Sequence, residues 1–172
     1  MRPFSQGGRI LTPPPRRFVM DLPPGLLHVL AQTRLYTDGR EYVVVSVPLE
    51  ALYEGTALLA KVVEPFSAAV VDKDELTLVF PTEVWGAVRE HLPERLEAAG
   101  YRLITFDLPL DLGLVGYLAT LTDVVAKAGV SMLAFSAYQR DHLLVPEADF
   151  DQAWRALDEF IARCQQQERG GG

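Results

Sequence analysis

The sequence DLPLDLGLVGYLA (residues 107–119) carries the clearest structural signal in this chain. It holds Gly113 and Gly116 in front of an apolar pattern with helical spacing. Two apolar segments follow, AGVSMLAFSAY (residues 128–138) and DHLLVP (residues 141–146), separated by a short polar turn. This order of a glycine-containing loop, a helix and a β-hairpin indicates mixed α and β structure, in which the loop connects a strand to the helix.

One order of elements occurs twice along the chain. A strand, a helix, a hairpin and a second helix are expected first over residues 41–47, 51–63, 66–71, 75–80 and 84–98, with Gly100 closing the last helix. The same elements are expected again over residues 101–108, 114–128, 130–136, 141–145 and 150–163. Short strands at residues 26–31 and 33–37 precede the first copy, and we expect them to supply the missing edge strand of each sheet.

Short sequence matches support the repeat. The segment Gly55-Thr-Ala-Leu-Leu-Ala parallels Gly116-Tyr-Leu-Ala-Thr-Leu, and Leu78-Val-Phe-Pro parallels Leu143-Leu-Val-Pro. The predicted fold is therefore α+β: two ferredoxin-like modules in tandem, with antiparallel sheets and helices on one face. The predicted division of the chain is a flexible N-terminal arm (1–17), a first module (18–99), a second module (100–164) and a flexible tail (165–172).

The second unit resembles an ACT domain, and in particular the tandem ACT modules of aspartokinases and of CASTOR-like amino-acid sensors. The glycine-containing loop, the Ala-Gly-Val-Ser that enters an apolar strand, and the strand that ends in Leu-Val-Pro before an acidic helix carry the resemblance. It covers residues 26–163 and is more specific in the second unit. The resemblance implies a non-catalytic protein that binds a free amino acid or similar small molecule between paired modules. Two modules in one chain could pair with each other, but free sheet edges and an apolar inner strand, expected over residues 130–136, favour a homodimer.

The loop itself has the chemistry that such a site needs. Gly113 and Gly116 lack a Cβ atom and let the backbone approach a small ligand, and the first helical turn has free N–H groups suited to a carboxylate. Asp111 or carbonyl groups of residues 130–134 can accept bonds from an amino group. The alternative is that the glycines only permit a tight turn and close packing. The predicted ligand-binding residues are Asp111, Leu112, Gly113, Leu114, Val115, Gly116, Val130, Ser131, Met132 and Leu133.

The sequence gives no support for catalysis, a metal or a cofactor. Asp141 and His142 are adjacent in a predicted strand, so their side chains should point to opposite faces. The other histidines have no carboxylate or cysteine at ligand spacing, and Cys164, the single cysteine, is expected to be an ordinary thiol in a helix. The main competing function is that of a structural or protein-interaction module that has kept an ACT-like fold and lost its ligand.

The charge of the chain argues against two classes of partner. It has 16 basic and 23 acidic residues, a net charge of −7, and four of the basic residues lie in the acid-free segment 1–17. An acidic body disfavours nucleic acids and anionic membrane surfaces. The N-terminus lacks the apolar core of a signal peptide, and no uncharged run is long enough to span a bilayer. Together with the single cysteine, these features predict a cytoplasmic protein.

Overall fold

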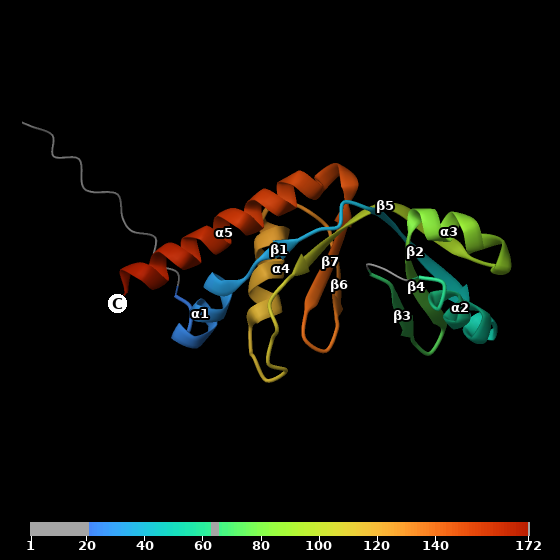
Figure 1. Cartoon of the computed structure of the whole chain (residues 1–172), viewed down its shortest axis with the longest axis horizontal. Helices are drawn as coiled ribbons and strands as arrows, with labels where there is room; N and C mark the ends of the chain where they lie inside the picture. The colour runs from blue at the N-terminus through green and yellow to red at the C-terminus, as the bar shows by residue number, and fades with distance from the viewer. Residues whose placement is uncertain (1–20, 63–65, 172) are drawn as a thin grey trace, which may run out of the picture.

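An antiparallel sheet of seven strands forms the centre of the fold in the computed structural model, which describes residues 21–62 and 66–171 (Figure 1). The strand order is β3-β4-β2-β5-β7-β6, and β1 pairs with β5. The α+β class with an antiparallel sheet is thus confirmed. The predicted arm of residues 1–17 lies outside the described residues. The strands are β1 (Leu35–Tyr36), β2 (Glu41–Pro48), β3 (Ala68–Val71), β4 (Glu75–Pro81), β5 (Leu96–Phe106), β6 (Leu133–Ser136) and β7 (Asp141–Pro146).

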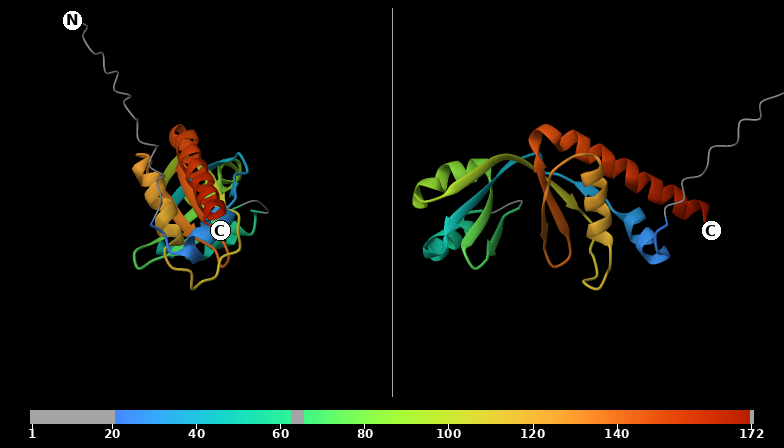
Figure 2. Two further views of the ribbon diagram at one scale, coloured as in Figure 1. Left: turned by 90° about the vertical axis from the view of Figure 1, so that its left-hand side faces the viewer. Right: turned by 180° about the vertical axis from the view of Figure 1, so that it is seen from behind.

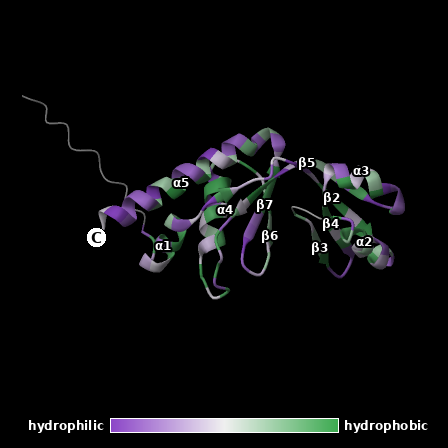
Figure 3. Cartoon of the chain, viewed as in Figure 1, coloured by the Kyte–Doolittle hydropathy of each residue, from purple (hydrophilic) through white to green (hydrophobic). Residues whose placement is uncertain are grey.

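The helices alternate with these strands along the chain. They are α1 (Pro24–Gln32), α2 (Leu52–Leu59), α3 (Thr82–Val88), α4 (Tyr117–Lys127) and α5 (Phe150–Gly170). Short 3-10 turns at Leu49–Ala51, Arg89–His91 and Glu147–Asp149 lead into or out of three of them. Hydrophilic residues dominate the visible surface of α5, whereas hydrophobic residues dominate α4 (Figure 3).

Strand β5 belongs to both halves of the sheet. Its first residues pair with β2, as in Val44 with Ala98, and its last residues pair with β7 and β1. The two halves therefore have the orders β3-β4-β2-β5 and β6-β7-β5-β1. Gly100 within β5 has φ +81°, a conformation that favours glycine, and the register with β2 shifts between Tyr42 and Val44. Figures 1 and 2 show β5 passing from one half to the other.

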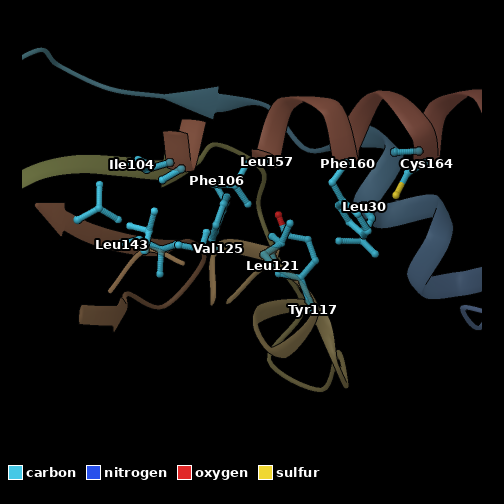
Figure 4. Close-up of a cluster of buried hydrophobic side chains, with 14 of the residues drawn as sticks. Leu30, Ile104, Phe106, Tyr117, Leu121, Val125, Leu143, Leu157, Phe160 and Cys164 are labelled. Atoms are coloured by element: carbon cyan, nitrogen blue, oxygen red, sulfur yellow. The ribbon is translucent and has the colours of Figure 1, made fainter. Parts of the chain in front are cut away.

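In the described chain, the helices pack on one face of the twisted sheet. In the first half, alternate residues of β2 and β4 pack against α2 and α3, with Val45, Leu78 and Phe80 fully buried. In the second half, Ile104 and Leu143 pack against α1, α4 and α5 (Figure 4). This period-2 alternation is the pattern expected of strands that have one face in a helix-covered core.

The other side of the sheet, which we call the open face, carries a smaller apolar cluster. Among the described residues this cluster contains no helical residue; Tyr42, Leu103 and Leu144 form part of its buried centre. The ring of Phe66 lies edge-on to the rings of Tyr42 and Phe135, at centroid distances of 6.0 and 6.2 Å. The open face is therefore partly covered by one aromatic side chain from the segment before β3.

The N-terminal segment differs from its prediction. Residues 26–31, expected as a strand, belong to α1, because Pro24 suits the first turn of a helix and Leu26, Leu30 and Ala31 recur on one buried face. Only β1 extends the sheet, and it pairs with β5 in the second half. Helix α1 also packs on α5 and α4. This segment therefore completes the second half of the molecule, although it precedes the first half in sequence.

Several helix boundaries also differ, and two of the differences are large. The helix expected over 84–98 ends at His91, and Leu96 already belongs to β5, because Pro93 cannot continue the helical hydrogen bonding. Gly100 consequently lies inside a strand rather than at a helix end. At the other end of the chain, α5 continues through Gly170, where we expected a tail from residue 165. Gln165 Nε2 donates to the carbonyl oxygen of Ala31 at 3.1 Å and links this last part of α5 to α1.

Gly55 provides a test of the packing between α2 and the sheet. A Cβ atom at this position would lie 2.7 Å from Leu76 Cδ2 and 3.1 Å from Leu78 Cδ1. Because both leucines are fully buried, we expect Gly55→Ala to lower the free energy of unfolding by about 1–3 kcal/mol, measured by urea denaturation. The matched control is Gly86→Ala in α3, where a Cβ atom meets nothing within 4 Å. It should raise stability by about 0.5–1 kcal/mol, and equal effects of the two changes would contradict the packing described.

Candidate functional site

The loop between β5 and α4 borders a cavity of about 250 Å³. One wall of the cavity is the loop and the first turn of α4, and the other wall is the turn of the β6–β7 hairpin. The lining residues are Leu110, Asp111, Leu112, Leu114, Gly116, Tyr117, Leu118 and Ala119 on the first wall and residues 136–141 on the second. Sequence segments about 25 residues apart are therefore brought together at one end of the second half.

The start of α4 presents unused backbone donors to this cavity. Gly116 precedes the helix with φ +89°, and the first hydrogen bond of the helix runs from the N–H of Thr120 to the carbonyl oxygen of Gly116. Residues 117–119 precede Thr120, so their N–H groups have no carbonyl acceptor within the helix. The first turn contains no acidic residue. Free N–H groups and the positive end of the helix dipole together favour an anionic group such as a carboxylate.

Hydrogen bonds hold the loop in shape. The Oδ1 atom of Asp111 accepts the N–H of Gly113 at 2.7 Å, and the N–H of Leu114 donates to the carbonyl oxygen of Asp111 at 3.0 Å. The N–H of Leu110 donates to the carbonyl oxygen of Gln139 at 2.9 Å, which ties the loop to the hairpin turn. The two walls of the cavity are therefore connected before any ligand binds.

Both signs of charge occur at this cavity. Arg140 Nε donates to Asp107 Oδ1 at 2.8 Å, and the guanidinium has further N–H donors. Asp141 accepts the hydroxyl of Ser136 at 2.6 Å through one of its two carboxylate oxygens. The cavity thus has a cation for a carboxylate, together with the carboxylates of Asp111 and Asp141 for an ammonium group.

Helix α1 and Thr33, the residue that caps its C-terminal end, contact α4. The hydroxyl groups of Thr33 and Tyr117 are hydrogen-bonded at 2.8 Å, and Thr33 Oγ1 also donates to the carbonyl oxygen of Val29 at 3.1 Å. Burial raises the pKa of Tyr117 to about 12, so this phenol remains protonated. The ring of Tyr117 lies beside Leu121 and near Leu30 in the core (Figure 4). The N-terminal segment therefore positions the end of α4 that faces the cavity.

The structure separates the predicted ligand-binding residues into two groups. Asp111, Leu112, Leu114 and Gly116 line the cavity. Gly113 belongs to the same loop and donates its N–H to Asp111, and Val115 projects into solvent with 85% of its surface exposed.

The second predicted group, Val130, Ser131, Met132 and Leu133, does not line this cavity. These residues follow the far end of α4, because the helix runs away from the cavity and β6 runs back toward it. Strand β6 was also expected to be an inner strand, but it pairs only with β7 in the described chain and forms an edge of the sheet.

The hairpin turn was predicted as a turn but not as part of the site. Residues 136–141 are polar and form a turn, which the sequence indicates, but their position beside the loop depends on β5 and β7 being neighbours. Arg140 is the most important residue that was missed. The sequence shows a polar turn between two apolar strands, but this pattern does not indicate which loop the turn will contact.

Other chemistry is not supported by the described residues. Within 21–62 and 66–171, no three His, Cys, Asp or Glu side chains are close enough to hold a metal ion. Burial raises the pKa of Cys164 to about 11, which keeps this thiol protonated. Ser136 bonds to Asp141 whereas His142 bonds to Thr105, so Asp141 and His142 lie on opposite faces as expected. No helix in the described part of the chain has both the length and the apolar character to cross a membrane.

Comparison with known proteins gives a family match over part of the chain and fold matches over most of it. Residues 98–159 match the family model described as the ACT domain. A crystal structure of a protein of unknown function from Vibrio cholerae, described as a possible transport protein, is 27% identical, with a TM-score of 0.60. The match covers 79% of this chain and 95% of that one. No curated protein matches the sequence.

Two regulatory subunits of aspartate kinase have the same fold. The subunit from Thermus thermophilus, in its ligand-free form, is 14% identical with a TM-score of 0.56, over 74% of this chain and 97% of that one. The subunit from Thermus flavus is 12% identical with a TM-score of 0.59, over 73% of this chain and 95% of that one. At such low identity these two matches concern the fold alone.

The contact between α1 and α4 can be tested by removing one hydroxyl. We expect Tyr117→Phe to lower the free energy of unfolding by about 0.5–1.5 kcal/mol, because a buried hydrogen bond to Thr33 is lost while Thr33 keeps its bond to Val29. Tyr53→Phe is the matched control, since the Tyr53 side chain is 84% exposed, and it should leave stability unchanged. Equal urea midpoints for the two variants would contradict the role of this contact.

Proposed function

We propose that this chain, in which residues 98–159 match the ACT domain and which has the fold of aspartate kinase regulatory subunits, is a non-catalytic regulatory protein that binds a free amino acid. The observation that carries this proposal is the cavity beside α4. This cavity of about 250 Å³ is bordered by the free N–H groups of residues 117–119 and by the guanidinium of Arg140. The carboxylates of Asp111 and Asp141 border it as well. These groups suit an α-amino acid, because its carboxylate and its ammonium group are attached to the same carbon atom.

The proposed orientation of the ligand follows from the charges. The α-carboxylate accepts bonds from the first turn of α4 and from Arg140. The ammonium donates to Asp111 and Asp141, each of which has one oxygen engaged by the protein and further acceptor capacity. Leu110, Leu114 and Leu118 also line the cavity and favour an apolar ligand side chain of modest size.

The corresponding loop of the first half has different electrostatics. It borders a cavity of about 420 Å³ that is lined by Glu50, Glu54, His91 and Glu94 among others. Three carboxylates would repel the carboxylate of an amino acid. We therefore assign ligand binding to the second half and a structural role to the first loop.

We propose further that the two halves are two ACT-type modules in tandem that share β5. The predicted boundaries, 18–99 and 100–164, then change: β5 belongs to both modules, and α5 extends the second one to Gly170. Residues 24–36 belong to the second module, because α1 packs on α5 and β1 pairs with the end of β5. Each half then has a four-stranded sheet of the ferredoxin-like order.

We also propose that the protein forms a homodimer through the edges of its sheet. Strands β3 and β6 end the path of paired strands, and they expose Val71 and Leu133. Unpaired strand edges can add to the sheet of a second copy. An amino acid would then regulate by binding one arrangement of the modules or copies more tightly than another.

Ala119 offers a direct test of the amino-acid site. It is exposed in the first turn of α4 and lines the cavity. Ala119→Glu should weaken amino-acid binding by about tenfold or more, because its carboxylate repels that of the ligand. An acidic residue in the first turn of a helix does not destabilise it, so folding should be unaffected. The matched variant Ala119→Gln has the same shape without the charge and should keep affinity within about threefold.

The measurement is calorimetric titration with the amino acid that gives the largest thermal shift among the common twenty. Binding of none of them at millimolar concentration would contradict the proposal and favour the structural or protein-interaction alternative. Equal affinities of the Glu and Gln variants would place the ligand away from α4.

A further inference from the structure

A second cavity of about 260 Å³ lies on the open face of the sheet. Its position follows from the strand register. Tyr36 pairs with Thr105, Thr105 pairs with His142, and His142 pairs with Phe135. Paired residues in neighbouring strands point to the same side, so these four side chains form one row across β1, β5, β7 and β6. Tyr36, Thr105 and His142 line the cavity, together with Phe66, Leu103, Asp107 and Arg140.

Aromatic rings form the sides of this cavity. The ring of Phe66 lies 4.7 Å from the imidazole of His142, with an angle of 41° between the two planes. Tyr36 stands two strands away along the row and is 48% exposed. Leu103 also lines the cavity and is buried. Flat walls of this kind favour a flat ligand that can stack on them.

Two side chains that line the cavity, Thr105 and His142, are polar and uncharged. Thr105 is buried, and its hydroxyl is hydrogen-bonded to His142 Nδ1 at 2.9 Å. Burial lowers the pKa of His142, so the imidazole is neutral near pH 7. The imidazole keeps hydrogen-bonding capacity at its second ring nitrogen. A ligand with ring heteroatoms therefore suits these two side chains better than a hydrocarbon.

The cavity lining also presents a donor next to an acceptor. Arg140 and Asp107 are joined by the 2.8 Å contact between Nε and Oδ1, and both line this cavity. The charges of these two side chains cancel each other. A neutral ligand that has its own adjacent acceptor and donor, such as a carboxamide, complements this pair without leaving a charge unpaired.

We propose that this cavity is a second ligand site, for a small neutral heteroaromatic molecule with an amide-like donor and acceptor edge. The ring lies between Tyr36 and the Phe66–His142 pair, and the amide edge faces Asp107 and Arg140. This site is separate from the proposed amino-acid site. Tyr36, Phe66 and His142 line only the open-face cavity, and Leu114 and Ala119 line only the other one, while Arg140 borders both.

The experiment is an NMR titration with nicotinamide as the probe. The chain has three histidines, and the imidazole signal of His142 is identified as the one missing from His142→Gln. Nicotinamide should shift this signal in a saturable way below about 50 mM. Cyclohexanecarboxamide, which has the amide without a flat ring, should bind at least about tenfold more weakly, and so should benzoate, which has the ring with a charge.

Tyr36→Ala is the test variant, because Tyr36 is half exposed and its removal takes away one wall without opening the core. It should weaken nicotinamide binding about tenfold. Two controls should leave this binding unchanged: Tyr138→Ala, which removes an exposed tyrosine at the other cavity, and Ala119→Glu, which disables the proposed amino-acid site.

Three results would overturn the inference: no saturable shift of the His142 signal, equal affinities of wild type and Tyr36→Ala, or benzoate binding as tightly as nicotinamide. None of these results depends on whether amino acids bind beside α4. The failure of this site and the failure of the proposed amino-acid site are therefore distinguishable.

Discussion

The pairing of β5 with three other strands is the interaction on which the rest of the structure depends. Residues 96–102 of β5 pair with β2, residues 101–105 pair with β7, and residues 105 and 106 pair with β1. At Tyr101 and Arg102 the ladders overlap, so these residues have neighbours on both sides. Without this overlap each half of the sheet would lose its connection to the other and expose an additional edge.

The geometry of the candidate site follows from the end of β5. The N–H of Asp107, directly after the strand, donates to the carbonyl oxygen of Arg34 at 2.8 Å, so the loop begins from a fixed point. The loop is then tied to the β6–β7 turn through Leu110, and α4 is held by Thr33 of the N-terminal segment. Residues from three distant parts of the sequence thus fix the cavity. The family match covers two of these parts, the loop and the hairpin, within residues 98–159.

Local patterns made much of this fold predictable. The β3–β4 and β6–β7 hairpins, β2, and the passage from loop to α4 all have clear apolar periods and turn residues within a short window. Leu96, Glu97 and Ala98 were expected in a helix, because these residue types favour one, and only pairing with β2 makes them a strand. Likewise, α1 is nine residues long and too short for its period to be distinguished from a strand. The loop half of the candidate site was predictable, but the contribution of Arg140 depends on strand order, which a local pattern does not contain.

A crystal structure of the chain grown with a mixture of free amino acids is the sharpest test of amino-acid binding beside α4. We expect a bound amino acid beside the first turn of α4, with its carboxylate within hydrogen-bonding distance of N–H groups of residues 117–119 and its ammonium near Asp111 or Asp141. An amino acid bound elsewhere on the molecule, or a cavity without one at amino-acid concentrations that saturate binding in solution, would contradict this expectation.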